Sequence, residues 1–387
     1  MFSSRLHWDL RPNRIAGALA AKRAAGGEIL DLTESNPTRA GFEYPGEEIL
    51  AALHDERALI YDPAPAGLQA AREAISGHYI ARGLSVEPAR ILISASTSES
   101  YAWLFKLLAD AGDHVLVPRP SYPLFEFLAQ LESVCVDGYP LLYHDGWQID
   151  FEALERAVTR QTCAIVLVNP NNPTGSFLKR QELDRLIALC GERDLAIVSD
   201  EVFADYAFAP DPARVSSLTG VNEVLTFCLS GLSKIAGLPQ MKLGWIAVGG
   251  PAALRAQAAE RLELIADTYL SAGTPVQHAL PRLLAAGAGV RQQISERVRA
   301  NLECLRSMVG TGSSGEVLRV EGGWYATLRV PRTRTEEEWC LDLLEHDSTL
   351  VQPGFFYDFE SEAFLIVSLL TETGKFREGV RRLTARL

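Results

Sequence analysis

The chain lacks any hydrophobic run long enough to cross a membrane, and its first residues lack the pattern of a signal peptide. Residues 1–14 are polar and of mixed charge, without the apolar core that a secretory signal carries. A membrane-spanning helix needs about 20 consecutive apolar residues, and no stretch of the sequence approaches that length. We therefore expect a protein that does not associate with membranes.

Cysteine and positive charge are also scarce. The six cysteines among 387 residues stand singly and form no C-x-x-C pair, which favours reduced thiols over disulfides or a zinc site. Acidic residues outnumber basic ones, the net charge is -12, and no lysine- and arginine-rich run interrupts this balance. Such a charge repels nucleic-acid phosphates and anionic lipid. The sequence thus predicts a cytoplasmic protein that binds neither nucleic acid nor membranes.

Several common catalytic motifs are missing. The sequence contains no H-E-x-x-H, no G-x-S-x-G and no G-x-x-x-x-G-K, and its seven histidines are scattered rather than placed at metal-ligand spacing. These absences disfavour zinc hydrolases, hydrolases with a serine nucleophile elbow, and phosphate-loop nucleotide hydrolases. We expect no metal site.

What the sequence does have is an alternation of short apolar runs and amphipathic stretches between about residue 47 and residue 250. This order is typical of parallel sheets with crossover helices. The amphipathic stretches include 67–81, 98–108, 151–158 and 179–190. Helical sequence follows over 251–309, and a Gly- and Ser-rich turn is expected at 312–315. Seven apolar runs are candidate strands: Ile91–Ser94, Val115–Pro118, Val134–Asp137, Ala164–Val168, Ala196–Ser199, Val224–Leu229 and Leu243–Val248.

The pattern predicts an α/β protein of two domains. The large domain, residues 46–287, would contain a mostly parallel seven-stranded sheet flanked by helices. A smaller α+β domain would be formed by the N- and C-terminal segments, residues 1–45 and 288–387. About the first 45 residues cannot bury a core alone, so we expect them to pack on the C-terminal segment or on a neighbouring subunit.

Lys234 lies in the segment SGLSKIAGLPQMKLGW at 230–245, where small residues leave room for a bulky cofactor. The apolar run Val224–Leu229 precedes it, so Lys234 would follow the carboxyl end of a strand, where open α/β sheets bind ligands. Burial there favours the neutral amine that a Schiff base requires. Taken alone, a lysine after a strand is usually a surface residue, so the rest of the chain must support a catalytic role.

Five further segments accompany the lysine. They are YDPAPAG at 61–67, STSE at 96–99, PSYP at 120–123, NPNNPTG at 169–175 and SDEVF at 199–203. Each is weak alone, but the six in this order and spacing resemble the class I/II aminotransferases of the pyridoxal-phosphate-dependent fold-type I superfamily. The resemblance runs from about Leu32 to the C-terminus. It implies an enzyme that moves an amino group between an amino acid and a 2-oxo acid.

The resemblance implies a role for each motif near the reacting atoms. Lys234 would hold the aldehyde of pyridoxal 5'-phosphate as an internal aldimine and would move the substrate's α-proton. Asp200 would pair with the pyridine nitrogen, Asn172 would donate to the ring oxygen, and Tyr122 would stack on the ring. Without the family order, a turn residue would be the preferred interpretation of Asn172 and a core aromatic that of Tyr122. A helix cap is a poor explanation of Asp200, given its neighbours.

The cofactor's phosphate would lie in a cradle of donors. Thr97 and Ser98 open a helix directly after a strand, where N–H groups and the helix dipole favour an anion. Lys242 would add a cation and Ser233 a hydroxyl. Tyr61 resembles the tyrosine that reaches the phosphate in the neighbouring subunit's site, which implies a homodimer with shared active sites.

Three positions depart from the family pattern. Lys242 stands where an arginine is commoner. A lysine contacts the phosphate as a point charge, whereas an arginine would form a bidentate hydrogen bond with it. Phe203 takes the place of a tyrosine that bonds the ring oxygen, so we expect a raised pKa for the Schiff base. Ile366 occupies the position of an arginine that commonly binds the substrate carboxylate. Arg39, in the N-terminal loop, is the first candidate to replace that arginine. Alternatively, the substrate has no α-carboxylate, or this divergent strand is misaligned with the family pattern.

Two other functions are compatible with these residues. A β-eliminating carbon-sulfur lyase uses the same cofactor and releases pyruvate and ammonia from cysteine-type substrates without an oxo-acid acceptor. A non-catalytic regulatory protein that keeps the cofactor pocket is the second. Ile366 favours it, whereas the presence of both Lys234 and Asp200 argues against it.

Overall fold

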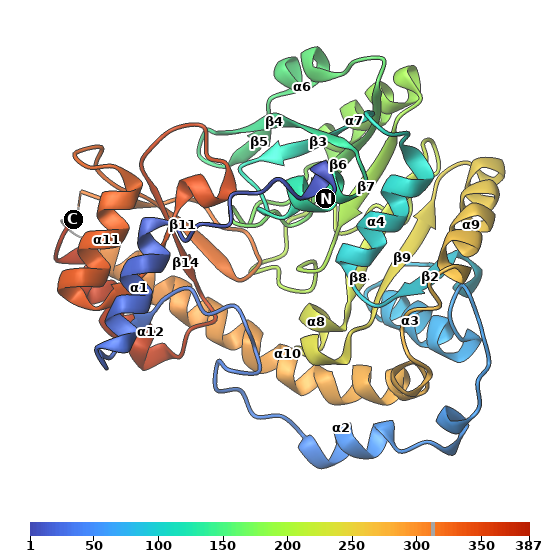
Figure 1. Ribbon diagram of the computed structural model, residues 1–387, viewed down its shortest axis with the longest axis horizontal. Helices are drawn as coiled ribbons and strands as arrows, with labels where there is room; N and C mark the ends of the chain where they lie inside the picture. The colour runs from blue at the N-terminus through green and yellow to red at the C-terminus, as the bar shows by residue number, and fades with distance from the viewer. Residues whose placement is uncertain (311–313) are drawn as a thin grey trace.

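The computed structural model describes residues 1–310 and 314–387, and its main body is a twisted sheet with helices on both faces (Figure 1). The sheet has eight strands in the order β2-β9-β8-β7-β6-β3-β4-β5. Strands β8, β7, β6, β3 and β4 run parallel to one another, whereas β9 and β5 run antiparallel to their neighbours. The strands are β2 (Ile91–Ser94), β3 (His114–Arg119), β4 (Cys135–Tyr143), β5 (Trp147–Ile149), β6 (Thr162–Val168), β7 (Ala196–Asp200), β8 (Thr226–Gly231) and β9 (Gly244–Gly249).

The seven predicted strands are all present, and the α/β class with a mostly parallel sheet is confirmed. The eighth strand, β5, was not predicted. It has three residues and pairs with β4 at the edge of the sheet, and so short a segment carries too little periodicity to be recognised in a sequence.

Alternate residues of the central strands face two separate hydrophobic cores. On β6, Ile165 and Leu167 belong to one core, and Ala164 and Val166 belong to the other. A parallel sheet buried on both faces requires such continuous apolar runs. The first core is covered by α2 (Gly46–Leu53), α3 (Gln69–Ala81), α6 (Phe151–Ala157), α7 (Arg180–Arg193) and the start of α10 (Thr274–Val309). The second is covered by α4 (Thr97–Leu108), α5 (Phe125–Leu131) and α9 (Ala252–Asp267).

A third core lies under a smaller antiparallel sheet, β10-β11-β14-β13. Its strands are β10 (Glu316–Val317), β11 (Tyr325–Arg329), β13 (Gln352–Pro353) and β14 (Phe364–Ser368). Helices α1 (Arg14–Ala24), α11 (Glu336–Asp347) and α12 (Thr373–Thr384) lie beside it (Figure 1). The remaining elements are α8 (Leu232–Ile235), β1 (Leu30–Asp31), β12 (Thr349–Leu350) and the 3-10 turns η1 (Ser4–Leu6), η2 (Glu56–Leu59), η3 (Pro88–Arg90), η4 (Pro239–Met241) and η5 (Gly354–Tyr357).

The N-terminal segment packs mainly on the C-terminal part of the chain, as expected. Strand β1 pairs in parallel with β12, and Leu32 packs so closely on α12 that a Cβ at Gly379 would lie 2.8 Å from its side chain. The first residues depart from this arrangement. Arg5 and Trp8 contact α5 of the large sheet instead, where the Trp8 indole donates to the Gln130 amide at 2.6 Å.

The domain boundaries stay a prediction. The expected junction at residues 287 and 288 falls inside α10, whose residues Val276–Leu283 pack in the large core and whose residues from Val290 onward pack in the small one. The predicted Gly- and Ser-rich turn at 312–315 lies partly outside the described residues. Within the described ranges, no helix is long and apolar enough to cross a membrane.

Candidate active site

A cleft of about 320 Å³ opens at the carboxyl edge of the large sheet. Parallel strands deliver their following loops to this edge, and the antiparallel β9 begins there, so residues before β9 also reach it. Eight of the ten residues predicted from sequence line this one cleft: Thr97, Ser98, Tyr122, Asn172, Asp200, Ser233, Lys234 and Lys242.

Lys234 lies on α8, one turn after β8 ends. Its ammonium nitrogen lies 4.7 Å from the centre of the Trp324 ring and 5.4 Å from that of Phe203. The Tyr206 hydroxyl donates to the backbone carbonyl of Lys234 at 2.6 Å, which ties α8 to the loop after β7. Burial lowers the pKa of Lys234 to about 8, although the charge of Asp200 acts in the opposite direction. A substantial fraction of this amine is therefore neutral near physiological pH.

Asp200 ends β7 and is almost fully buried. The Tyr101 hydroxyl donates to one carboxylate oxygen at 3.3 Å and the Val202 N–H to the other at 3.2 Å. Burial raises the pKa of Asp200 to about 6, more than these hydrogen bonds lower it. A buried carboxyl group in this position gains from a cationic partner in the cleft.

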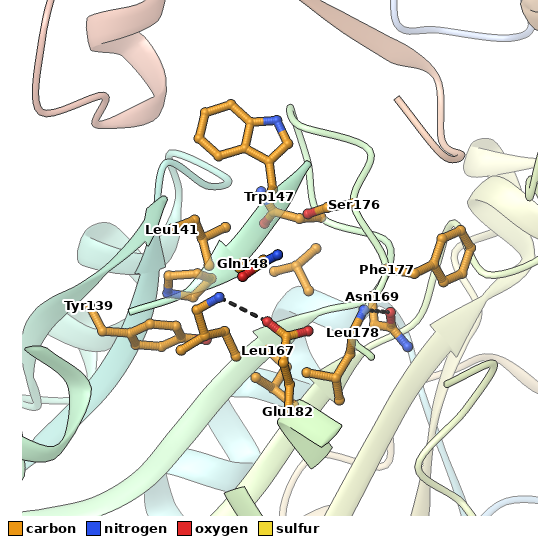
Figure 2. A pocket seen from close by; sticks show the side chains of 14 residues that line it. Tyr139, Leu141, Trp147, Gln148, Leu167, Asn169, Ser176, Phe177, Leu178 and Glu182 are labelled. Atoms are coloured by element: carbon orange, nitrogen blue, oxygen red, sulfur yellow. Dashed lines mark hydrogen bonds between the residues drawn. The ribbon is translucent and has the colours of Figure 1, made fainter. Parts of the chain in front are cut away.

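The loop that carries Asn172 is fixed by hydrogen bonds of the neighbouring residues Asn169 and Asn171. Asn169 accepts from the Leu178 N–H at 3.0 Å, beside a cavity of only about 30 Å³ that Figure 2 shows. Asn171 donates to the carbonyl of Pro120 at 3.0 Å. Asn172 itself is buried, and its side-chain oxygen has no hydrogen-bond partner among the described residues. Because a buried amide without a partner is costly, this side chain is placed for a ligand.

The start of α4 forms an anion cradle. Ser96 caps the helix by accepting from the Glu99 N–H at 3.2 Å, and Glu99 accepts in return from the Ala95 N–H at 2.6 Å. The Thr97 and Ser98 N–H groups have no such bond within the part of the chain that the structure describes, as is usual for the first turn of a helix. They line the cleft with their helix dipole directed toward it.

Lys242 and Gly244 complete the cradle from the β9 side. A Cβ at Gly244 would lie 2.9 Å from the Ser96 carbonyl carbon, so only glycine allows β9 to approach the helix start this closely. Lys242 adopts a left-handed backbone conformation with φ 50° and is exposed at the cleft. It forms no ion pair with any described residue, which leaves its charge available for an anion.

Tyr122 lines the cleft on a loop that is well anchored. The preceding Ser121 donates its N–H to the Tyr357 carbonyl at 2.9 Å and its hydroxyl to Asn171 at 3.1 Å. The Tyr122 ring packs edge-on against Phe125, and burial raises its pKa to about 12. The ring is thus rigidly placed and uncharged.

The small sheet and the N-terminal loop contribute residues to which the sequence assigned no role. Ser35 and Tyr325 line the cleft, and Trp324 packs edge-on against Phe203 and Tyr206, each at 5.2 Å. The Gly322-Gly323 pair before Trp324 was the available signal. A Cβ at Gly322 would lie 2.7 Å from the Tyr206 carbonyl, so glycine permits this close domain contact.

Three other positions of interest lie outside the cleft. Tyr61 is 76% exposed and Arg39 is also exposed, and neither is a lining residue. Ile366 is fully buried in β14 in the core of the small sheet. Among the described lining residues, Lys234 and Lys242 are the only cations. Within the described part of a single chain, the cleft therefore offers no arginine for a substrate carboxylate.

These groups fit one kind of cofactor. The cofactor's aldehyde would react with the amine of Lys234, whose pKa is lowered. Its ring nitrogen would pair with the buried carboxyl group of Asp200. Its anionic group would bind at the start of α4, near Lys242. The open N–H groups at the start of α4 support this fit. Fold and cleft together define an enzyme of the kind that uses pyridoxal phosphate.

Comparison with known proteins agrees. The family profile for aminotransferases of class I and II matches residues 28–383. The chain is 31% identical over 352 residues to the glutamate-pyruvate aminotransferase AlaA of Escherichia coli, covering 89% of this chain and 87% of that protein. It is 26% identical over 378 residues to an alanine aminotransferase of Mycobacterium tuberculosis, covering 94% and 86%.

Solved structures show the same fold. An aminotransferase from Escherichia coli superposes with a TM-score of 0.85 at 25% identity, covering 100% of this chain and 97% of the other. An alanine aminotransferase from Pyrococcus furiosus superposes with a TM-score of 0.88 at 21% identity, covering 100% and 99%. The chain belongs to the class I and II aminotransferases. It is accordingly an aminotransferase that depends on pyridoxal phosphate.

Proposed function

We propose that the protein moves an amino group between an amino acid and a 2-oxo acid in this cleft, with Lys234 as the reacting amine and proton carrier. The observation that carries the proposal is that one cleft contains both Lys234 and Asp200. Burial lowers the pKa of Lys234 to about 8 and raises that of Asp200 to about 6. A base whose pKa lies near the working pH can both take and return a proton.

The bound cofactor supplies an electron sink for the carbanion that forms when the substrate loses its α-proton. Lys234 would bind the cofactor. Once its amine is free, it would accept the α-proton at its nitrogen and then donate that proton to a different carbon atom. Asp200 would hold the protonated ring nitrogen, oriented by Tyr101. Asn172 would bond the ring oxygen, and Tyr122 would stack on the ring.

The phosphate would be held by Thr97, Ser98, Ser233 and Lys242. Support comes from the open N–H groups at the start of α4 and the unpaired charge of Lys242. The Phe203 and Trp324 rings lie close to the Lys234 nitrogen. They would exclude water from it, and exclusion of water strengthens the local electrostatic interactions.

The amino donor and acceptor follow from the relatives. We propose the alanine and 2-oxoglutarate pair for the first assay, because a curated relative is named for glutamate and pyruvate. Arg39 is our candidate for the substrate carboxylate. Its support is its position four residues after Ser35, a lining residue on the same loop.

A homodimer completes the proposal. Tyr61 lies in an exposed apolar stretch with Leu59 and Ile60. Consecutive exposed apolar side chains of this kind favour a protein interface. Tyr61 is outside the cleft of its own chain, which fits a role at the partner's phosphate. We also propose a cytoplasmic location, in keeping with the six cysteines, which are all free in the structure.

The dimer can be tested by complementation. Mixing an inactive Tyr61→Phe variant with an inactive Lys234→Ala variant should form hybrids with one intact site and recover part of the activity. If sedimentation shows a monomer, or if hybrids stay inactive while both variants dimerise, the shared site is wrong.

The reaction itself is tested by the absorbance spectrum of the protein with pyridoxal phosphate. Single amino acids are added without any oxo acid. We expect one class of donor to convert the bound cofactor to its pyridoxamine form in a single turnover. Release of pyruvate and ammonia from cysteine-type substrates would indicate a lyase instead, and a bound cofactor that no donor converts would contradict the proposal.

A further inference from the structure

A second cavity of about 460 Å³ lies between the large sheet and the small one. Its walls come from the end of β3, from the β4–β5 hairpin, from the end of β11 and from the loop before β14. It shares no described lining residue with the cofactor cleft. Cavities of this size at domain junctions are common ligand sites.

Two guanidinium groups in this cavity have hydrogen-bonding capacity to spare. Arg119 reaches the carboxylate of Glu126 only at 3.7 Å, and its Nε is buried without a partner among the described residues. Arg332 is exposed and forms no ion pair or hydrogen bond with any described residue. A third arginine, Arg329, is already bonded to Glu316 at 2.8 Å.

Glu360 also lines the cavity, so the lining carries three positive charges and one negative charge. In a chain of net charge -12, this is a local positive region. Guanidinium groups bind carboxylates through paired N–H donors. The charge therefore favours an anion with oxygen acceptors.

The rest of the wall is aromatic. The Tyr143 and Trp147 rings pack edge-on at 5.2 Å, as do Trp147 and Phe359 at 5.9 Å, whereas the Phe359 and Phe364 rings are tilted by 32° at 4.6 Å. Figure 2 shows the Trp147 indole turned away from Glu182, out of the small cavity behind the Asn169 loop. Its N–H is buried without a partner within the described ranges. The Arg329 guanidinium lies over the Tyr143 ring at 5.3 Å from its centre, so the cavity combines aromatic and cationic surfaces that suit a flat apolar body with an acidic group.

We propose that this cavity binds a planar aromatic carboxylate, with the acid on Arg119 and Arg332 and the ring among Tyr143, Trp147 and Phe359. The ligand would bridge the two sheets. Its anchor also lies next to the cleft, because Arg119 precedes Pro120, whose carbonyl accepts from Asn171, the neighbour of Asn172.

The test uses 2-naphthoate as the probe and the holoenzyme as the protein, with binding measured by isothermal titration calorimetry. We expect saturable binding that 2-naphthamide, of the same shape without the charge, does not reproduce. Arg119→Gln and Arg332→Gln should each weaken binding about tenfold, because each removes a charged hydrogen bond. Arg334→Gln is the matched control, since Arg334 pairs with Asp342 and does not line the cavity.

Arg332 is exposed, so its variant tests the site even if the Arg119 variant fails to fold. A Lys242→Gln holoenzyme distinguishes the two cavities. Loss of binding in that variant, with binding retained in Arg332→Gln, would place the probe in the cofactor cleft and overturn the proposal. Equal binding of the amide, or no binding at millimolar probe, would overturn it as well.

Discussion

The two ends of the cofactor cleft are built differently. At the cofactor end, Asp200, Asn172, Lys234 and Lys242 follow or precede strands of one sheet, and each has a charge or an unused polar atom. At the other end, the lining comes from the N-terminal loop and the small sheet and is neutral, as Ser35 and Tyr325 show. Under the proposed function, the first end would carry out the chemistry, whereas the second would select the substrate.

The largest effect is expected from removing the amine at the cofactor end. Lys234→Met should lower kcat by about 10³-fold or more, because it removes the group that moves the proton. Steady-state kinetics and the loss of the covalently bound cofactor's absorbance band measure this. Lys375→Met, on the exposed face of α12, is the control. Retention of a tenth of the activity would contradict the role of Lys234.

The same variant has a stability signature in the cofactor-free protein. Burial depresses the pKa of Lys234 from its ordinary 10.5 to about 8, so between these values the unfolded chain holds more protons. The stability contribution of Lys234 therefore rises with pH over that window and is unfavourable below it. Lys234→Met should stabilise the protein at pH 7 by about 3 kcal/mol, and denaturant unfolding at pH 7 and pH 10 would show whether most of the gain disappears.

Asp200→Asn is expected to have the next largest effect. The variant keeps the shape and the Tyr101 hydrogen bond but removes the charge that would pair with a protonated ring nitrogen. Loss of a buried charge pair should weaken cofactor binding about a hundredfold, as measured by fluorescence titration. Asp267→Asn on the exposed side of α9 should change nothing. Unchanged affinity in Asp200→Asn would mean that no such pair forms.

Phe203→Tyr changes a residue that lies between the two ends of the cleft. The Phe203 ring centre lies 5.4 Å from the Lys234 nitrogen, so a hydroxyl at this position would reach into the cleft. A new donor to the ring oxygen stabilises its charged form. We expect the pH midpoint of the holoenzyme's absorbance change to fall by about one unit. Phe127→Tyr on the exposed side of α5 is the control, and an unchanged midpoint would contradict the expectation.

The smallest effect is expected at the neutral end. If Arg39 contacts the substrate carboxylate, Arg39→Ala should raise KM for the amino donor about tenfold and leave kcat nearly unchanged. Steady-state kinetics with and without saturating donor separate the two constants. A KM that changes by less than about twofold would remove Arg39 from the site and leave the carboxylate to another residue.

The sequence predicted which residues meet in the cleft, and the reason is physical. Parallel strands end at one edge of their sheet, so residues that directly follow them in the sequence meet in space. Eight predicted residues from 97 to 242 meet there. The same strands were recognisable because both faces of the sheet are buried, which produces continuous apolar runs.

The residues that the sequence did not reveal lie where distant segments meet. The Tyr206 hydroxyl donates a hydrogen bond to the Lys234 carbonyl, and the Trp324 ring of the small-sheet region lies 4.7 Å from the Lys234 nitrogen. The arginines and aromatic rings of the second cavity come from both sheets. No local pattern marks such contacts, since they depend on how two packed units sit against each other.

By itself, the sequence determined the α/β class, the family, and which residues following strands would meet in one cleft, because these depend on local periodicity and on motifs in a set order. Only the tertiary structure decided the neutral character of the substrate end, the pKa shifts of Lys234 and Asp200, and the second cavity. Those properties depend on burial and on the packing of segments from opposite ends of the chain, which spacing along a sequence does not encode.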